Sequence, residues 1–413
     1  MKSTTFSKIQ TSLSLIVFTL AAALATSAPA HAQTFSVLYG FLGYPTDGGN
    51  SYGDLIQDSD GNLYGTTYYG GSDDHGTIFK IDPSGTRTIL YTFLHSDIAA
   101  GAFPQGGLFR DPEGNLYGTT FAGGNSNCNC GTIFKLDTSN NLTTLHQFNS
   151  YTSGRYPESR LLDVKGTLYG TTAGGGGACS SANGGCGVVF SLNSAGRYAV
   201  VHEFTGTADG SQPGDLIRDS AGNLYGAAEL DGPDGFGTVF EIDTSGTFAI
   251  LHTFTGGSDG GYPQGRLLRD VNGNIHGVAG TAADRLDQGE VFHLDASGTL
   301  SVLRTFTNPA KGLHPLSLLD VGGVLYGATY GGGDTNCDVS GIGNEGCGVL
   351  FQIGKTGEYS VVHTFEMTDG EQPTGALTLG IDGIVYGVTL KGGATCPSAD
   401  RLGTCGVVFQ YKP

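Results

Sequence analysis

The chain has 413 residues, of which 20 are Lys or Arg and 38 are Asp or Glu, so its formal net charge is −18. A chain this acidic is repelled by phosphate backbones, and we expect no nucleic-acid partner. Its 71 glycines and lack of tryptophan suggest disorder, but 22 Phe and 19 Tyr recur at regular intervals. Regularly spaced aromatic residues indicate a packed core.

The N-terminus has the features of a secretion signal. Two lysines precede an apolar stretch at residues 13–25, and the small residues of AHA at 30–32 suit a signal peptidase. We expect cleavage after Ala32, a mature chain over 33–413, and an extracellular or periplasmic location. The apolar stretch is shorter than the roughly 20 residues of a membrane span, and no transmembrane segment is expected in the mature chain.

The rest of the sequence consists of seven repeats. Each contains a leucine-rich run before an aspartate (GDLIQD), a GNLYGTT run, a GTIF or GVVF run, and a run ending in Phe (TILYTF). The runs are rich in β-branched and aromatic residues and are bounded by Gly, Asp or Asn, as strands are. A Tyr-Gly dipeptide, or its variant, marks the repeats at Tyr64, Tyr117, Tyr169, Tyr225, His276, Tyr326 and Tyr386.

Four short strands in about 50 residues form one blade of a β-propeller. The fourth-strand pattern appears first at Phe35–Phe41, before any complete repeat, whereas the last repeat stops after GVVFQYKP. A ring in which the N-terminal strand completes the last blade explains both ends and removes two exposed sheet edges. We therefore predict an all-β fold, a single seven-bladed β-propeller domain over residues 33–413, with four antiparallel strands per blade.

The second run of each repeat predicts how the blades pack. Leu63 and Tyr64 should point to opposite faces of their sheet, so that each contacts a different neighbouring blade. We expect Gly65 to let a bulky side chain from the adjoining sheet approach closely.

The phrase L-Y-G-T-T-x-x-G-G…G-T-V-F resembles the GloVer tandem repeat of exported bacterial proteins known as choice-of-anchor GloVer-containing proteins, and the resemblance covers nearly all of residues 35–413. It implies export and a repeat β architecture, and it brings no catalytic residues. Some members carry a C-terminal surface anchor, whereas this chain ends on the strand at Val407–Tyr411.

The two faces of the predicted ring differ in their loops. Loops between strands one and two, and between three and four, are tight turns such as DSDGN; we call this side the tight-turn face. Loops between strands two and three, and between blades, are long and variable, and we call that side the long-loop face. Because binding residues concentrate on variable loops, we expect any ligand on the long-loop face.

All eight cysteines fall in the loops between strands two and three. Export favours disulfides within each loop, whereas zinc is disfavoured because the pairs occupy separate blades. The pairing of the closely spaced Cys128 and Cys130 stays open from sequence. The expected pairs are Cys128/Cys130, Cys179/Cys186, Cys337/Cys347 and Cys396/Cys405.

Two patterns that suggest chemistry have structural interpretations. The turn at residues 58–62 (DSDGN) faintly resembles a calcium loop, but other blades replace it with DVKGT or GIDGI, and an Asx-turn is favoured. We expect no cofactor, since nothing supports a structural calcium ion. Four histidines align at a single position of strand four, where a structural role is favoured; they are His146, His202, His252 and His363, beside Tyr39, Tyr91 and Arg304.

The candidate site is placed where the repeat is most altered, because such positions have given up packing that their equivalents retain. Blade five has His276 in place of tyrosine and Glu290 in place of threonine, and blade four has Glu229 in its own altered loop. We predict His276 or Glu229 as proton-transfer groups and Arg266 and Arg285 as anion clamps. Arg160, Asp215 and Glu290 complete the predicted binding residues. The competing interpretation is that the charged residues form inter-blade salt bridges and that blade five has drifted neutrally.

The leading functional hypothesis is a secreted binding module for a glycan or an envelope protein. The loop-proximal aromatic residues that could stack on sugars are Tyr68, Tyr69, Phe121, Tyr156, Phe236, Tyr262 and Tyr330. The first alternative is a polysaccharide lyase or glycoside hydrolase on the same face, based on fold analogy. The second is a structural envelope protein. Sequence alone does not identify the ligand, the oligomeric state or any surface attachment.

Overall fold

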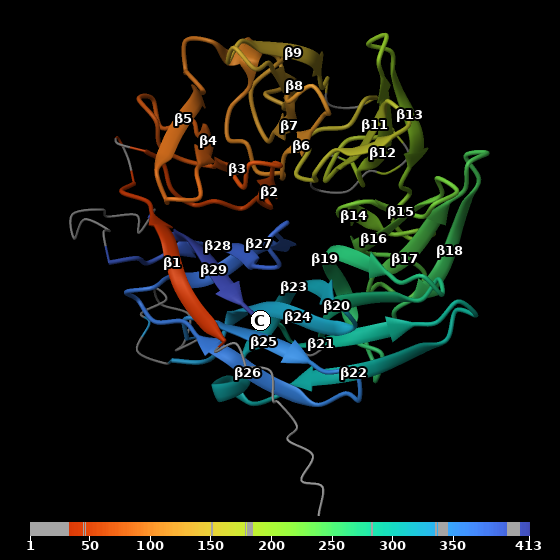
Figure 1. Cartoon of the computed structure of the whole chain (residues 1–413). Coiled ribbons are helices and arrows are strands. Elements are labelled where there is room, and N and C mark those ends of the chain that lie inside the picture. The colour runs from red at the N-terminus through yellow and green to blue at the C-terminus, as the bar shows by residue number, and fades with distance from the viewer. Residues whose placement is uncertain are drawn as a thin grey trace, which may run out of the picture. The chain divides into compact units, whose positions relative to one another are not determined.

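The computed structural model describes residues 33–43, 45, 47–149, 152–177, 179, 185–281, 284–334, 337, 346–394 and 405–413, with the backbone alone at 281 and 284–288. From Thr34 to Pro413 the chain forms seven antiparallel sheets arranged in a ring (Figure 1). This confirms the predicted seven-bladed β-propeller. No helix in these residues is long and apolar enough to cross a membrane.

Each blade runs from an inner first strand to an outer fourth strand. Blade one has β2 (Ile56–Gln57), β3 (Leu63–Thr67), β4 (Thr77–Ile81) and β5 (Arg87–Thr92). Blade two has β6 (Phe109–Arg110), β7 (Leu116–Thr120), β8 (Thr132–Leu136) and β9 (Leu142–Gln147). Blade three has β10 (Leu162–Val164), β11 (Thr167–Thr172), β12 (Val188–Asn193) and β13 (Tyr198–Glu203).

The remaining blades follow the same order. Blade four has β14 (Ser211–Pro213), β15 (Ile217–Arg218), β16 (Leu224–Leu230), β17 (Thr238–Ile242) and β18 (Phe248–Thr253). Blade five has β19 (Gly261–Arg269), β20 (Ile275–Thr281), β21 (Asp284–Leu294) and β22 (Leu300–Phe306). Blade six has β23 (Leu313–Val321), β24 (Val324–Gly331), β25 (Val349–Ile353) and β26 (Tyr359–Thr364). Blade seven has β27 (Glu371–Leu379), β28 (Val385–Lys391), β29 (Val407–Lys412) and β1 (Thr34–Gly40).

The ring closes as predicted. Strand β1 pairs antiparallel with β29, with Phe35 opposite Tyr411 and Val37 opposite Phe409. The short helical turns η1 (Ile98–Ala100) and η2 (Pro309–Lys311) lie in connections between blades.

First strands depart from the expected five to seven residues. They have two residues in β2 and β6 but nine in β19, β23 and β27. In blades five and seven the pairing register shifts around Gly265 and Gly375, whose φ angles are 64° and 63°. Only glycine adopts such a backbone without strain. The inner strands therefore bend at the channel. The composition of a first-strand run does not predict how many of its residues pair with the second strand.

Packing between blades follows the expected alternation. Leu63 packs in a cluster with Tyr386 and Val388 of blade seven, whereas Tyr64 packs in a cluster with Leu116 and Phe134 of blade two. Successive residues of β3 therefore contact different blades, which confirms the prediction.

The prediction for Gly65 is wrong in one respect, because the approaching side chain comes from the same sheet. Gly65 lies opposite Phe79 in the register, and a Cβ there would stand 2.7 Å from Phe79 Cζ. The phenylalanine ring lies across the glycine and is fully buried. Every blade has this pair, the others being Gly118–Phe134, Gly170–Phe190, Gly226–Phe240, Gly277–Phe292, Gly327–Phe351 and Gly387–Phe409.

Three of the four aligned histidines join outer strands to the connections that follow them. His202 Nε2 lies 2.8 Å from Asp209 Oδ2, and the pairs His252–Asp259 and His363–Asp369 are similar at 3.3 and 3.0 Å. The prediction that they share one repeat position is confirmed, since each lies at the same point of its strand register. The seven residues are Tyr39, Tyr91, His146, His202, His252, Arg304 and His363.

Candidate functional site

A cavity of about 450 Å³ lies on the ring axis and is lined by residues from all seven blades. Its wall is built from the beginnings of first strands and the ends of second strands, where Ala173, Glu229 and Tyr330 lie. Both ends belong to the long-loop face. The cavity is therefore the mouth of the central channel on the face that the sequence favours for a ligand.

In each blade, one residue with a left-handed backbone conformation lies where the chain turns into this mouth. The φ angles of these non-glycine residues lie between 52° and 57°, an uncommon left-handed conformation. In blade three the N–H of Tyr156 donates to the carbonyl of Cys130 in the preceding blade, at 2.9 Å. The seven residues are Asn50, Phe103, Tyr156, Gln212, Tyr262, His314 and Gln372.

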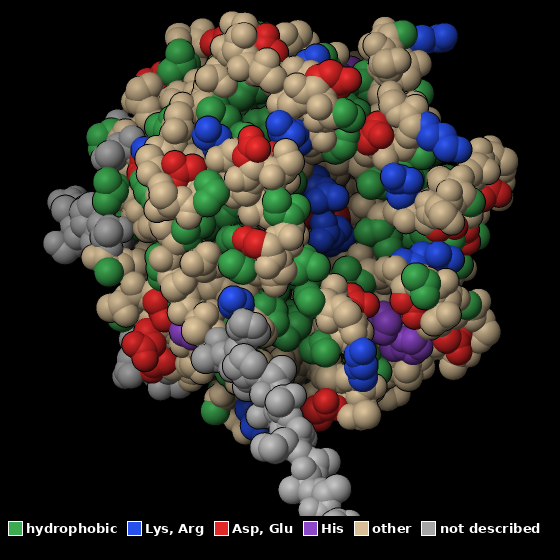
Figure 2. Space-filling view, in the orientation of Figure 1, with side chains coloured by type: hydrophobic (Ala, Val, Ile, Leu, Met, Phe, Trp, Pro, Cys, Tyr) green, Lys and Arg blue, Asp and Glu red, His purple; other side chains and the backbone are tan. Residues whose placement is uncertain are grey.

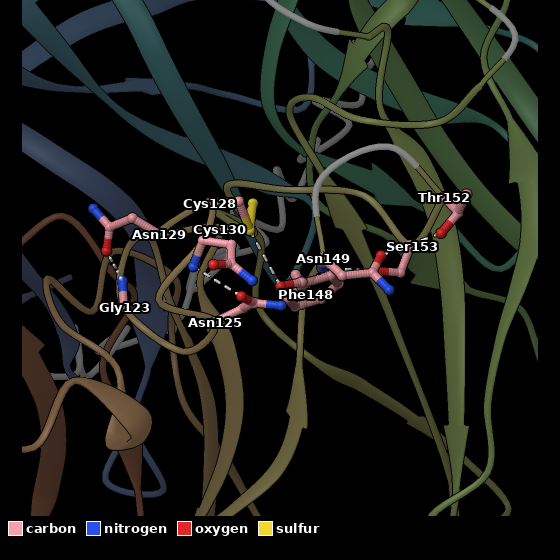
Figure 3. The surroundings of a disulfide bond; sticks show 10 residues. Gly123, Asn125, Cys128, Asn129, Cys130, Phe148, Asn149, Thr152 and Ser153 are labelled. Carbon is pink, nitrogen blue, oxygen red and sulfur yellow. Dashed lines mark hydrogen bonds between the residues drawn. A yellow bond between two sulfur atoms is a disulfide. The ribbon is translucent and has the colours of Figure 1, made fainter.

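These turns connect the cysteine loops to the channel. Cys130 closes a disulfide with Cys128, in the loop drawn in Figure 3, where the N–H of Gly123 donates to Asn129 Oδ1 at 2.5 Å. Likewise, the carbonyl of Cys186 accepts the N–H of Gln212 at 2.9 Å. Each disulfide therefore borders the residue that positions the next inner strand.

Three of the predicted disulfides are confirmed: Cys128–Cys130, Cys179–Cys186 and Cys337–Cys347. Cys396, the predicted partner of Cys405, lies outside the described residues. In the parts of the chain that the structure describes, no three His, Cys, Asp or Glu side chains are grouped to hold a metal ion.

Four charged side chains from four blades meet across the channel. Arg266 Nη1 lies 3.2 Å from Asp54 Oδ2, and Arg160 Nη1 lies 4.0 Å from the same oxygen. Asp215 accepts the backbone N–H of Arg160 at 2.8 Å. Lys and Arg side chains are visible at the centre of the ring in Figure 2. Two carboxylates and two partly exposed guanidinium groups neutralise one another here.

Asp215 is the member of this cluster whose pKa is raised. Burial and the neighbouring Asp54 carboxylate raise the pKa of Asp215 to about 6, although the Arg160 N–H and the two arginines act in the opposite direction. The cluster therefore takes up a proton near pH 6 and becomes net positive below it.

Two glutamates face the same cavity, one from blade three and one from blade four. Glu158 is exposed to the cavity but enclosed by its walls, and this partial burial, together with Glu229, raises the pKa of Glu158 to about 7. Gln264 Nε2 donates to Glu229 Oε1 at 3.2 Å. Near neutral pH Glu158 is therefore partly protonated, and it can either donate a hydrogen bond as an acid or accept one as a carboxylate.

Half-buried aromatic rings adjoin the cavity over blades one to three. Tyr52, in the cavity wall, contacts Tyr68 with ring centroids 5.4 Å apart, and Tyr68 stacks on Phe103 at 5.0 Å. Phe121 stacks on Tyr156 at 4.6 Å. Much of the predicted aromatic set therefore packs ring on ring at blade junctions. Tyr330 lies in the cavity wall, and Tyr69 and the pair Phe236–Tyr262 make edge contacts.

The structure brings together some of the predicted site residues and separates others. Arg160, Asp215, Arg266 and Glu229 lie in or beside the cavity. His276 does not, because it is the second residue of β20, near the tight-turn face. The side chain of Arg285 lies outside the described residues.

His276 has a histidine as its neighbour. His293 Nδ1 lies 3.0 Å from His276 Nε2, and burial and His293 together lower the pKa of His276. Glu229 stands at the other end of its strand, as the sixth of the seven residues in β16. The two predicted proton-transfer groups therefore belong to opposite faces of the ring.

Glu290 is buried in blade five away from the cavity wall. It lies opposite Ala279, where blade one has the hydrogen-bonded hydroxyls of Thr67 and Thr77. Its Oε1 has no hydrogen-bond partner among the described residues. Burial and the nearby Asp259 raise the pKa of Glu290 to about 7.

Two site residues escaped the sequence analysis. Asp54 occupies the same repeat position as Arg160, Asp215 and Arg266, and alignment of the leucine-rich runs would have found it. Glu158 appears in PESRL where blade two has PQGGL, which is a signal of the same kind.

The model of the Gloeobacter/Verrucomicrobia repeat matches residues 24–183 and 177–399. The chain belongs to this repeat family. The resemblance seen in the L-Y-G-T-T-x-x-G-G phrase is thereby confirmed. A search of curated proteins gave no significant match.

This chain of the Gloeobacter/Verrucomicrobia repeat family is similar in fold to several solved structures. It is similar to the extracellular domains of two hybrid two-component systems from B. thetaiotaomicron, with TM-scores of 0.54 and 0.53 and identities of 13% and 14%. The alignments cover 92% of this chain but only 41% and 42% of those chains, so this chain spans about two fifths of their length. At such identities the similarity shows the fold alone.

Proposed function

We propose that the protein is a secreted binding module that holds a carbohydrate at the channel mouth of the long-loop face. The observation that carries this proposal is the composition of the cavity wall. Carboxyl, amide and guanidinium groups converge there from blades one to five, next to half-buried aromatic rings. Hydroxyl-rich ligands are recognised by such polar groups, while aromatic faces stack on their C–H surfaces.

The volume and charge of the cavity restrict which classes of ligand it can bind. About 450 Å³ accommodates a few sugar rings rather than a protein surface. The arginines are already neutralised by Asp54 and Asp215, and Glu158 and Glu229 add negative charge at neutral pH. The cavity therefore favours a neutral or amino-bearing sugar over a polyanion.

A glycan panel followed by calorimetric titration would test this function. The substitution Arg266→Ala should weaken binding by at least roughly tenfold, or about 1.4 kcal/mol, because Arg266 lines the cavity. His276→Ala is a suitable control, since His276 belongs to the tight-turn face. Failure of the folded wild-type protein to bind any glycan of the panel would contradict the proposal.

The acid–base environment of the mouth favours one second candidate, a glycoside-cleaving enzyme. Glu158, with a pKa of about 7, could protonate a leaving oxygen, and the Glu229 carboxylate from the next blade could support the reaction. Release of reducing ends from neutral polysaccharides, lost in Glu158→Gln, would establish an enzyme. Glycan binding without product release would leave the binding module.

A further inference from the structure

A second cavity lies on the tight-turn side, between blades two and three. Its volume is about 530 Å³, somewhat larger than that of the channel mouth. Leu145, Leu168 and Leu192 give it apolar walls, and the rings of Phe109 and Tyr117 border it. The charged residues that line this groove are Asp111, Glu113, Lys135 and Asp163.

Two of the equivalent junctions between other blades show how an arginine fills this space. Arg110 of blade two lies opposite Leu116 in the register, and its guanidinium stands over the ring of Tyr64 in blade one, 5.9 Å from the centroid. Arg269 of blade five, opposite Ile275, stands over Tyr225 of blade four at 4.8 Å. At these junctions an arginine from one blade covers the tyrosine of the preceding blade.

A third junction uses a shorter polar residue in the same way. Gln57, which lies opposite Leu63, hydrogen-bonds with Tyr386 of blade seven and accepts the N–H of Ile381 at 2.8 Å. In three of the seven blades the side chain at this repeat position therefore reaches across the junction.

At the junction of blades two and three this position is Asp163, which lies opposite Leu168. Its carboxylate accepts the N–H of Gly166 in its own turn, at 3.0 Å. Asp163 is thus turned back toward blade three, and the space beside Tyr117 stays open as the groove.

One cation already lies near this tyrosine. Lys135 Nζ is 5.6 Å from the ring centroid of Tyr117. It belongs to β8 of the same blade as Tyr117, so it does not occupy the position that a blade-three side chain would take. The groove remains although Lys135 lines it.

We propose that this groove binds the guanidinium group of an arginine side chain presented by a partner polypeptide. The guanidinium would lie over Tyr117 as those of Arg110 and Arg269 lie over their tyrosines. Asp163 supplies negative charge at the position where the filled junctions have Arg110 or Arg269, Glu113 adds to it, and charge-assisted hydrogen bonds favour the planar fork of arginine over lysine. The alkyl stem would pack on Leu168 and Leu192.

The two filled junctions support this ligand chemistry, because they share the remaining features of the groove. The hydroxyl of Tyr117 donates to Asp111 Oδ2 at 3.1 Å, as Tyr64 donates to Asp58 at 2.9 Å and Tyr225 to Asp219 at 3.3 Å. The same tyrosine–aspartate pair therefore faces an internal arginine twice and an open groove once.

Titration of the whole mature protein with N-acetyl-arginine amide, followed by NMR, tests the proposal. We expect saturable binding at millimolar concentrations, with N-acetyl-lysine amide at least about fivefold weaker. Asp163→Arg supplies the missing guanidinium from within the chain, so it should abolish binding and raise Tm. Asp60→Arg makes the same charge change at an exposed turn residue on the same face and should retain binding.

Asp163→Ala provides a second variant that does not depend on how a new arginine packs. It keeps the groove and removes one carboxylate, and binding should fall at least roughly fivefold. No saturable binding by the wild type, or equal binding by the wild type and folded Asp163→Arg, would overturn the proposal. Glycan binding at the channel mouth should be unaffected by these variants, so the two sites can fail independently.

Discussion

Two adjacent positions on the inner strands differ in how much their residues vary from blade to blade. One is leucine in every blade, buried between sheets: Leu55, Leu108, Leu161, Leu216, Leu267, Leu318 and Leu377. The residue before it differs from blade to blade: Asp54, Gly107, Arg160, Asp215, Arg266, Ser317 and Ala376. The first position faces a neighbouring blade, whereas the second faces the axis.

The difference follows from rotational repetition. A residue between blades meets the same environment seven times, so one good solution serves in every blade. Residues at the axis meet one another, and seven identical charged groups there would repel across a short distance. Asp54, Asp215, Arg160 and Arg266 avoid this by pairing opposite charges. Varied polar groups able to bind a ligand are therefore expected at the axis, and between blades only where a junction departs from the repeat, as it does at Asp163.

The largest effect should come from opening the ring. A chain that starts at Leu42 lacks β1, which exposes the edge of β29 and removes the fully buried Phe41. We expect its Tm to fall by roughly 10 °C or more relative to a chain starting at Thr34. Calorimetry of the two chains measures this, and equal Tm values would show that β1 does not close the ring.

Removing one charge at the axis should come next. Asp54→Ala leaves Arg160 and Arg266 without their shared carboxylate. Loss of one partner from a fully buried pair costs about 3–5 kcal/mol, and the cost here should be smaller because both arginines are partly exposed and keep Asp215 nearby. The double variant Asp54→Ala/Arg266→Ala should recover part of this loss. Denaturant unfolding of the single and double variants measures the coupling, and strictly additive costs would contradict the pairing.

A matched pair of glycine substitutions distinguishes the effect of packing within a blade from the effect of a change in the cavity wall at the axis. In Gly226→Ala the new Cβ would stand 2.6 Å from Phe240 Cζ, and such overpacking costs roughly 1–3 kcal/mol. At Gly214, in the cavity wall, the nearest atom is 3.5 Å away, and alanine should cost less than about 0.5 kcal/mol. Gly214→Ala should instead alter glycan binding. If the two variants were equally stable, the two glycines would not differ in how tightly they are packed.

A smaller, pH-dependent effect is expected at Glu290. Its raised pKa means that the folded protein binds a proton that the unfolded chain has lost, so stability falls as pH rises from about 4.5 to about 7. Glu290→Gln should stabilise the protein by roughly 1–3 kcal/mol at pH 8 and have little effect near pH 4. Unfolding curves at both pH values measure this, and a gain independent of pH would exclude the titration.

The sequence predicts most of what is repeated and little of what is unique. Strand order, ring closure and the alternation of Leu63 and Tyr64 follow from local patterns that recur seven times. The side chain that approaches Gly65 was assigned to the wrong sheet, because the sequence of a single strand does not show which residue of its partner strand, here Phe79, lies opposite. The charge cluster required residues far apart in the chain, Asp54 and Arg266, to be placed at one axis. His276 was grouped with Glu229 although its place at the start of a strand already pointed to the other face.

The loops between strands two and three have a common base. The N–H of the glycine that precedes strand three donates to a carbonyl at the end of strand two, from Gly76 to Gly70 in blade one and from Gly348 to Gly332 in blade six. Five residues separate the first pair and fifteen the second. Insertions in these loops therefore leave the ring unchanged, so selection can lengthen one loop at a time. The same bases are natural places to graft foreign peptides and so turn the ring into a display scaffold.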